Sequence, residues 1–182
     1  LDKSTIKADC SAVNREFLVG DKFSSSGIEV TATNAGKEVN LREVASAADN
    51  GYVVTIYDKN GGVIPADEFS NAKSGTYYIA VTYGATVLAD RTNAIGTIPG
   101  GSQEYTYAIE ILDIESLTLT PDFSTYMGGQ TPTMQVKAVY ENGVTKNFDN
   151  YEYFIAADAD ATSGTASFAE PGSEVKNYIV AF

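Results

Sequence analysis

The chain has 182 residues, of which 43% are apolar and 20% charged, enough bulk for one large domain or two small ones and too few charges for a disordered chain. Its 24 acidic and 12 basic residues give a formal net charge of -12, which excludes the phosphate backbone of nucleic acids as a favourable partner. The absence of His excludes serine triads and histidine zinc sites, and no apolar run approaches the ~18 residues of a membrane span.

The sequence holds one cysteine, Cys10, which has no second cysteine with which to form an internal disulfide. The residues before it lack the apolar run of a signal that ends in a lipidated cysteine. Because a free cysteine usually packs as a small hydrophobe, we expect Cys10 to be a buried or unreactive thiol.

Apolar and polar residues alternate with a period of two in the segments 28–33, 77–83, 105–111 and 134–140, which is the pattern of half-buried strands. The side chains predicted to face inward are Ile28, Val30, Ala32, Tyr77, Ile79, Val81, Tyr83, Tyr105, Tyr107, Ile109, Ile111, Met134, Val136, Ala138 and Tyr140. Residues 41–48 are the one stretch with a helical pattern, long enough for a turn or two. The alternation therefore predicts an all-β chain.

Glycine-containing pairs at 50–51, 61–62, 99–100 and 142–143 fall between the apolar runs and predict tight turns. In the segment YENGVTKNFDNY (140–151), Asn142 and Gly143 are both expected to take the positive φ angles of a two-residue hairpin loop. Many short strands with regular turns are typical of a sandwich or a barrel.

The chain repeats its pattern, which favours two sandwiches over one barrel. Residues 17–20 (FLVG) correspond to 126–129 (YMGG), and GIEVTATNAGKEVNL lies in the first copy where TMQVKAVYENGVTKNF lies in the second. A small-residue turn at 74–77 (SGTY) has its counterpart at 171–173 (PGS). The two copies differ in loop length and not in the order of their parts.

The repeated pattern resembles the bacterial Ig-like domains, which occur in tandem on bacterial surface proteins. The residues that carry the resemblance are Phe17, Gly20, Val30, Ala32, Gly75, Tyr77, Tyr126, Gly129, Val136, Ala138, Tyr140, Gly143 and Gly172. The resemblance implies two tandem immunoglobulin-like β-sandwich domains, 1–112 and 113–182, joined through EILDIESL with almost no linker.

Two departures from the family pattern are expected to matter. The first copy carries a long insertion near 89–103, and the second stops where the family would have a further hairpin and strand. An exposed sheet edge in the second copy is then expected, with a neighbouring segment or subunit as the source of its last strand.

The acidic clusters favour structural roles over chemistry. DKNGG (58–62) opens like a calcium loop but lacks the later oxygen ligands, so a hairpin turn is the favoured interpretation, and calcium is the one cofactor left open. Asp149, Asp158 and Asp160 are expected to be solvated loop residues. No catalytic or metal site is predicted, and no enzymatic activity is expected.

Binding residues are predicted in the insertion, because function on sandwiches is usually carried by loops held on rigid strands. The candidates are Asp90, Arg91 and Asn93, with Tyr151 as an exposed aromatic side chain outside the insertion. For the insertion as a whole, a tolerated disordered segment is favoured over a binding loop. Tyr105 and Tyr107 are expected to pack in the core.

The family resemblance implies a non-catalytic spacer or adhesion segment of a larger bacterial surface protein, extracellular or secreted, whose partners are neighbouring domains of the same polypeptide. The alternative is a ligand-binding module for polysaccharide or a host surface protein, which would use the 89–103 loop or exposed tyrosines. Loss of glycan binding on deletion of that loop would favour the second function.

Overall fold

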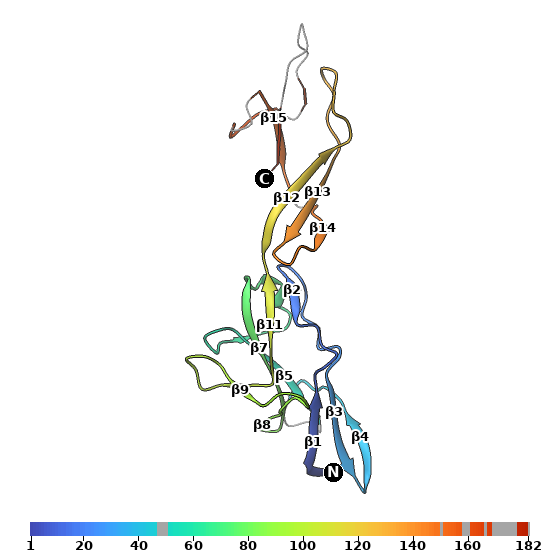
Figure 1. The fold of residues 1–182 in the computed structure, drawn as a ribbon, viewed down its shortest axis with the longest axis vertical. Helices are drawn as coiled ribbons and strands as arrows, with labels where there is room; N and C mark the ends of the chain where they lie inside the picture. Colours follow the sequence, from blue (N-terminus) through green and yellow to red (C-terminus); the bar gives the residue numbers. More distant parts are fainter. Residues whose placement is uncertain (47–50, 150, 158–160, 166, 169–177, 182) are drawn as a thin grey trace. The chain divides into compact units, whose positions relative to one another are not determined.

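The structure is a computed structural model, and it describes residues 1–46, 51–149, 151–157, 161–165, 167–168 and 178–181. The chain forms two compact units, Leu1–Asp113 (unit 1) and Ile114–Phe182 (unit 2). The described residues form strands, turns and one 3₁₀ turn, η1 (Phe69–Asn71), with no α-helix among them (Figure 1). The predicted all-β class is therefore confirmed.

Unit 1 contains two main sheets and one small hairpin. The first sheet is antiparallel with the order β1-β3-β4, formed by β1 (Asp2–Asp9), β3 (Glu29–Asn34) and β4 (Lys37–Leu41). The second has the order β2-β11-β7-β5-β6, with β8 paired to β7. Its strands are β2 (Glu16–Leu18), β5 (Val53–Tyr57), β6 (Val63–Ile64), β7 (Gly75–Tyr83), β8 (Thr86–Val87) and β11 (Tyr107–Leu112), and the hairpin is β9 (Gly96–Thr97) with β10 (Glu104–Tyr105).

Buried side chains from both sheets of unit 1 share one apolar core. Val30 of the first sheet and Ile56, Ile79 and Ile109 of the second are each at most 2% exposed and belong to the same cluster. Phe69 of η1 lies among three other rings, with centroid distances of 5.2 Å to Phe17, 5.5 Å to Phe23 and 6.1 Å to Tyr77. Two sheets over one core are compatible with a β-sandwich, whereas the Ig-like identity of both units stays a prediction.

Unit 2 contains a three-stranded sheet and a two-stranded one. The first has the order β12-β13-β14 and the second pairs β15 with β16. Their bounds are β12 (Ile114–Pro121), β13 (Met134–Tyr140), β14 (Thr145–Asn147), β15 (Tyr153–Ala156) and β16 (Tyr178–Ala181). Val136, Ala138 and Tyr140 of β13 and Ile155 of β15 are buried. The source of a further strand for this unit stays a prediction.

The predicted alternation is confirmed in β3 and β13, but β7 differs. Tyr78 and Ala80, expected on an open face, are 8% and 0% exposed, as buried as Ile79 on the core side. The reason is that β10 packs beside β7, with the Tyr105 ring centroid 4.7 Å from that of Tyr78. Tyr105 therefore lies on the opposite face from Tyr107, because the chain bends at Thr106 between β10 and β11.

Hairpin turns are found at the glycine pairs 61–62, 99–100 and 142–143, with one correction, whereas the pair at 50–51 includes Asn50, which lies outside the described residues. Tyr140 donates its N–H to the Val144 carbonyl at 2.9 Å, and Gly143 has φ 80°. Asn142 does not take a positive φ; its side-chain oxygen instead accepts the Val144 N–H at 3.1 Å. In unit 1 the corresponding turn has positive φ at both central residues, Ala35 (50°) and Gly36 (79°).

The helical pattern at 41–48 forms no helical turn in residues 41–46, the part that the structure describes. Leu41 ends β4 and pairs with Val30, and Glu43 makes a parallel bridge with Tyr52. Pairing with neighbouring strands overrides the local helical pattern here. The predicted sites Asp158 and Asp160, and the turn at 171–173, lie outside the described residues.

Candidate functional site

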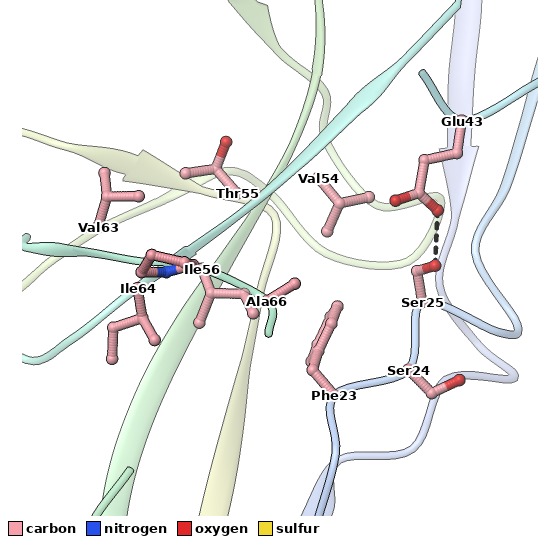
Figure 2. A pocket seen from close by; sticks show the side chains of 11 residues that line it. Phe23, Ser24, Ser25, Glu43, Val54, Thr55, Ile56, Val63, Ile64 and Ala66 are labelled. Atoms are coloured by element: carbon pink, nitrogen blue, oxygen red, sulfur yellow. Dashed lines mark hydrogen bonds between the residues drawn. The ribbon is translucent and has the colours of Figure 1, made fainter. Parts of the chain in front are cut away.

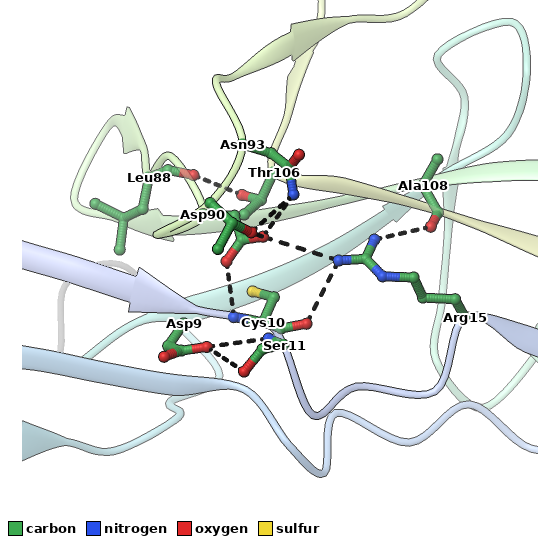
Figure 3. Close-up of polar contacts among 10 residues, drawn as sticks. Asp9, Cys10, Ser11, Arg15, Leu88, Asp90, Asn93, Thr106 and Ala108 are labelled. Atoms are coloured by element: carbon green, nitrogen blue, oxygen red, sulfur yellow. Dashed lines mark hydrogen bonds and ion pairs between the residues drawn. The ribbon is translucent and has the colours of Figure 1, made fainter.

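Unit 1 offers two candidate sites. One is a cavity beside β5 and β6 (Figure 2), and the other is a cluster of polar side chains around Asp90 (Figure 3). The cluster contains Asp90, Arg91 and Asn93, three of the four residues that the sequence predicted for binding. Tyr151 belongs to unit 2, where its hydroxyl donates to the Met134 carbonyl at 3.2 Å. The structure thus divides the predicted residues between the two units.

The segment 89–103, which carries the first three candidates, is a folded part of unit 1. β9 in this segment pairs with β10, which directly follows it, and Ile98 is 1% exposed. A Cβ atom built on Gly96 would overlap the ring of Tyr105, so the ring can lie there only over a glycine. The segment helps to cover one face of the second sheet, and it is not the disordered insertion that the sequence favoured.

The Asp90 carboxylate is 5% exposed and is surrounded by donors. Its Oδ1 accepts the backbone N–H of Cys10 at 2.9 Å. Its Oδ2 accepts the Thr92 hydroxyl at 3.1 Å and the Asn93 side-chain amide at 3.0 Å, and lies 3.8 Å from Nη2 of Arg15. A buried carboxylate with this many donors is stabilised as the anion.

The electrostatics of the cluster follow from burial and these donors. Burial raises the pKa of the Asp90 carboxyl, but hydrogen bonds from Cys10, Asn93, Thr92 and the Arg91 backbone together bring that pKa below its ordinary value. Burial, with a smaller contribution from the Asp90 charge, raises the pKa of the Cys10 thiol to about 12. The predicted buried, unreactive thiol is thus consistent with a 0% exposed Cys10.

Arg15 holds the other side of the cluster. Its guanidinium donates to the carbonyls of Cys10 at 3.4 Å and Ala108 at 3.5 Å, and lies 5.1 Å from the centroid of the Tyr107 ring. β1 ends at Asp9 in the first sheet and β2 begins at Glu16 in the second. The cluster therefore fixes the segment in which the chain crosses from one sheet to the other.

Arg91 and Asp9 add a second, more exposed ion pair beside the crossing. Nη1 of Arg91 lies 3.2 Å from Oδ2 of Asp9, and the Arg91 backbone N–H donates to the Ala8 carbonyl at 2.9 Å. Hydrogen bonds from Ser11, with a contribution from Arg91, lower the pKa of the Asp9 carboxyl. Asp90 and Arg91 thus support the fold directly, and an ionised carboxylate surrounded by donors is not suited to proton transfer.

The cavity has a volume of about 480 Å³ and is lined by the segment 23–25, by Glu43, and by residues 54–56 and 63–66. Figure 2 shows Phe23, Val54 and Ala66 around it, with the Ser25 hydroxyl bonded to the Glu43 carboxylate. It combines an apolar wall with one carboxylate, a composition typical of ligand pockets.

Metal ligands do not gather in the part of the chain that the structure describes: no group of three or more His, Cys, Asp or Glu side chains is found there. The DKNGG segment is a hairpin turn, in which Oδ1 of Asp58 accepts the N–H groups of Asn60 and Gly62, both at 2.8 Å. Within the same residues no helix has the length and hydropathy needed to cross a membrane.

Sequence reasoning missed Arg15, Thr106 and Glu43. Thr106 is 2% exposed, and its hydroxyl accepts the Val81 N–H at 2.9 Å and donates to the Leu88 carbonyl at 2.8 Å. The one signal for it was a polar residue inside the apolar alternation of 105–111. Arg15 and Glu43 gave no signal, because their side-chain partners, Asp90 and Ser25, lie far away along the chain.

Comparisons with known proteins found no matching family model, curated protein or solved structure. The resemblance to bacterial Ig-like domains therefore stays a prediction, and the function is argued from the chain's own geometry.

Proposed function

We propose that the chain is a non-catalytic, load-bearing spacer or adhesion segment of a bacterial surface protein, which displays neighbouring modules of the same polypeptide outside the cell. The support comes from the way in which unit 1 joins its second strand to its last.

The observation that carries the proposal is the parallel pairing of β2 with β11. Glu16, Phe17 and Leu18 lie opposite Glu110, Ile111 and Leu112, and every other strand pair of the described sheets is antiparallel. The ladder is extended by the Val19 N–H, which donates to the Leu112 carbonyl at 3.0 Å, and by the Glu110 N–H, which donates to the Arg15 carbonyl at 2.9 Å.

Parallel pairing matters because of the direction in which the chain would be pulled. A force that separates the start of β2 from the end of β11 acts along both strands in opposite senses, so it loads their hydrogen bonds together rather than one by one. Asp113 alone separates β11 from β12 of unit 2, so tension from the C-terminal side enters this pair at the end of β11, whereas tension from the N-terminal side reaches β2 through β1, which pairs with β3. The Asp90 cluster holds the segment just before β2.

Single-molecule force spectroscopy tests the proposal, with the chain pulled by its two ends. Val19→Pro removes one hydrogen bond of the β2–β11 ladder and should lower the unfolding force of unit 1. Val30→Ala in β3 is the matched control, because it destabilises the core without touching the ladder. An equal loss of force in the two variants at equal loss of stability would show that the ladder does not bear load.

The alternative function, a ligand-binding module for polysaccharide or a host protein, is favoured by the cavity rather than by the 89–103 loop. Deletion of that loop would remove the buried Asp90 and Ile98, so loss of glycan binding in such a variant would report unfolding. A glycan array with point variants at exposed positions is the sharper test. If the chain binds no glycan on the array, the spacer function is favoured.

A further inference from the structure

The cavity beside β5 and β6 has a preorganised apolar wall. Ile56 is 2% exposed and belongs to the core, while Phe23, Val54 and Ile64 are partly buried and pack against it. The Phe23 ring is fixed by a centroid distance of 5.5 Å to Phe69. The wall of the cavity is therefore supported from behind by the packed core of unit 1, and it needs little ordering before a ligand binds.

The opposite wall is polar, and its one charged side chain is the acidic Glu43. Glu43 is exposed at the cavity and accepts a hydrogen bond from the Ser25 hydroxyl through Oε2. Neither ion pair of the described residues involves Glu43, and no Lys or Arg lines the cavity. The hydrogen bond from Ser25 orients the Glu43 carboxylate and occupies one lone pair of Oε2. The remaining lone pairs of the carboxylate can accept hydrogen bonds from a cation.

We propose that this cavity binds a lysine or arginine side chain of a partner polypeptide, together with an apolar side chain next to it. The cation would pair with Glu43, and the apolar neighbour would cover Phe23 and Ile64. The volume of about 480 Å³ exceeds that of a single side chain and lies in the range of small-ligand sites. The net charge of -12 would also attract basic segments over a longer range.

A polypeptide fits this wall better than a neutral sugar. Four of the seven apolar lining side chains are β-branched aliphatic groups and one, Phe23, is aromatic, whereas sugars stack on flat aromatic faces. Addition of a peptide strand to the edge of β6 is disfavoured, because that strand has two residues and Pro65 follows it. The contact is therefore a side-chain contact, independent of the load-bearing role of β2 and β11.

The test is an NMR titration of the isotope-labelled chain with a blocked peptide, acetyl-Gly-Leu-Lys-Leu-Gly-amide. Saturable shifts are expected at the amides of Phe23, Ser25, Val54 and Ile64. The same peptide with norleucine in place of lysine keeps the shape and removes the charge, and should bind about tenfold more weakly. Ala66→Phe, at an exposed position of the lining, should block the site without removing a core residue.

Glu43→Gln should weaken binding of the lysine peptide by about threefold to tenfold. Glu38→Gln in β4 is the matched control: it removes the same charge from an exposed acidic residue outside the cavity and should leave affinity unchanged. Absence of shifts in the cavity up to about 10 mM peptide, equal affinity of the two peptides, or an equal loss in both Glu variants would overturn the proposal.

Discussion

The Asp90 carboxylate accepts the backbone N–H of Cys10 at 2.9 Å, across 80 positions of sequence. The bond joins the segment after β8 to the point at which the chain leaves the first sheet for the second. Both partners are buried, so without the carboxylate the Cys10 N–H would lack this acceptor in a place that water reaches poorly. This long-range bond makes Asp90 part of the fold rather than an exposed binding residue.

Replacement of Asp90 tests this role. Asp90→Ala should lower the free energy of unfolding by about 3 kcal/mol, because it removes three hydrogen bonds and leaves a buried donor unpaired. Asp90→Asn keeps an acceptor for Cys10 and should cost about 1 to 2 kcal/mol. Urea unfolding measures both, and an unchanged midpoint in Asp90→Ala would contradict the assigned role.

The stability that the Asp90 charge contributes should depend on pH. Its pKa in the folded chain lies below the ordinary value, so the unfolded chain binds the proton more readily. The contribution is therefore complete above the unfolded pKa of about 4 and is lost as pH falls through the folded pKa. The difference in stability between the wild type and Asp90→Asn should shrink as the pH falls below about 4, and a constant difference would contradict the assignment.

Thr106 should be required for its hydroxyl and not for its shape. Thr106→Val keeps the volume but leaves the Val81 N–H without its acceptor, at a cost of about 2 kcal/mol. Thr106→Ser keeps both hydrogen bonds and loses one methyl group, at a cost of about 1 kcal/mol. Chemical denaturation should therefore show that Thr106→Val is less stable than Thr106→Ser. The reverse order of stability would show that packing dominates at this position.

Cys10 should react only when unit 1 opens. The thiol is 0% exposed and burial raises its pKa to about 12, so both access and the thiolate are lacking at neutral pH. Labelling with iodoacetamide should be slow in the native chain, complete in urea, and faster in Asp90→Ala than in the wild type. Rapid labelling of the native wild type would place the thiol at the surface.

The sequence predicts strands and turns of this fold well, because these depend on neighbours along the chain. Period-two alternation located β3, β7, β11 and β13, and glycine pairs located the turns after β5 and β13. The helical pattern at 41–48 forms no helical turn in residues 41–46, since Leu41 pairs with Val30 in the adjacent strand. The local sequence pattern of a segment does not show which strand that segment will pair with.

The candidate sites were predicted less well, for a related physical reason. Asp90, Arg91 and Asn93 were predicted as binding residues, and the sequence could not show that Asp90 is buried against Cys10 and Arg15. The second buried face of β7 was missed in the same way, because the ring that covers Tyr78 comes from Tyr105, after the insertion. Burial of a polar group is set by contacts between distant segments.

Two hairpin turns test backbone strain, because each has a residue with positive φ, Ala35 in unit 1 and Gly143 in unit 2. Substitutions at these two residues should change stability in opposite directions. Ala35 has φ 50°, a conformation that costs a side-chain-bearing residue roughly 1 to 2 kcal/mol and a glycine little. Ala35→Gly should therefore stabilise unit 1 by about 0.5 kcal/mol, after the larger entropy of the unfolded glycine is subtracted. Gly143→Ala in unit 2, at φ 80° and with open space around the new Cβ, should destabilise by about 1 kcal/mol.

Ala85→Gly is the control for this pair of variants. Ala85 is an exposed turn residue between β7 and β8 that does not take a positive φ, so glycine there should destabilise by about 0.5 to 1 kcal/mol. Thermal unfolding monitored by circular dichroism measures all three variants. If Ala35→Gly and Ala85→Gly shift the melting temperature in the same direction, the positive φ of Ala35 stores no strain, and the turn after β3 owes its shape to the strands alone.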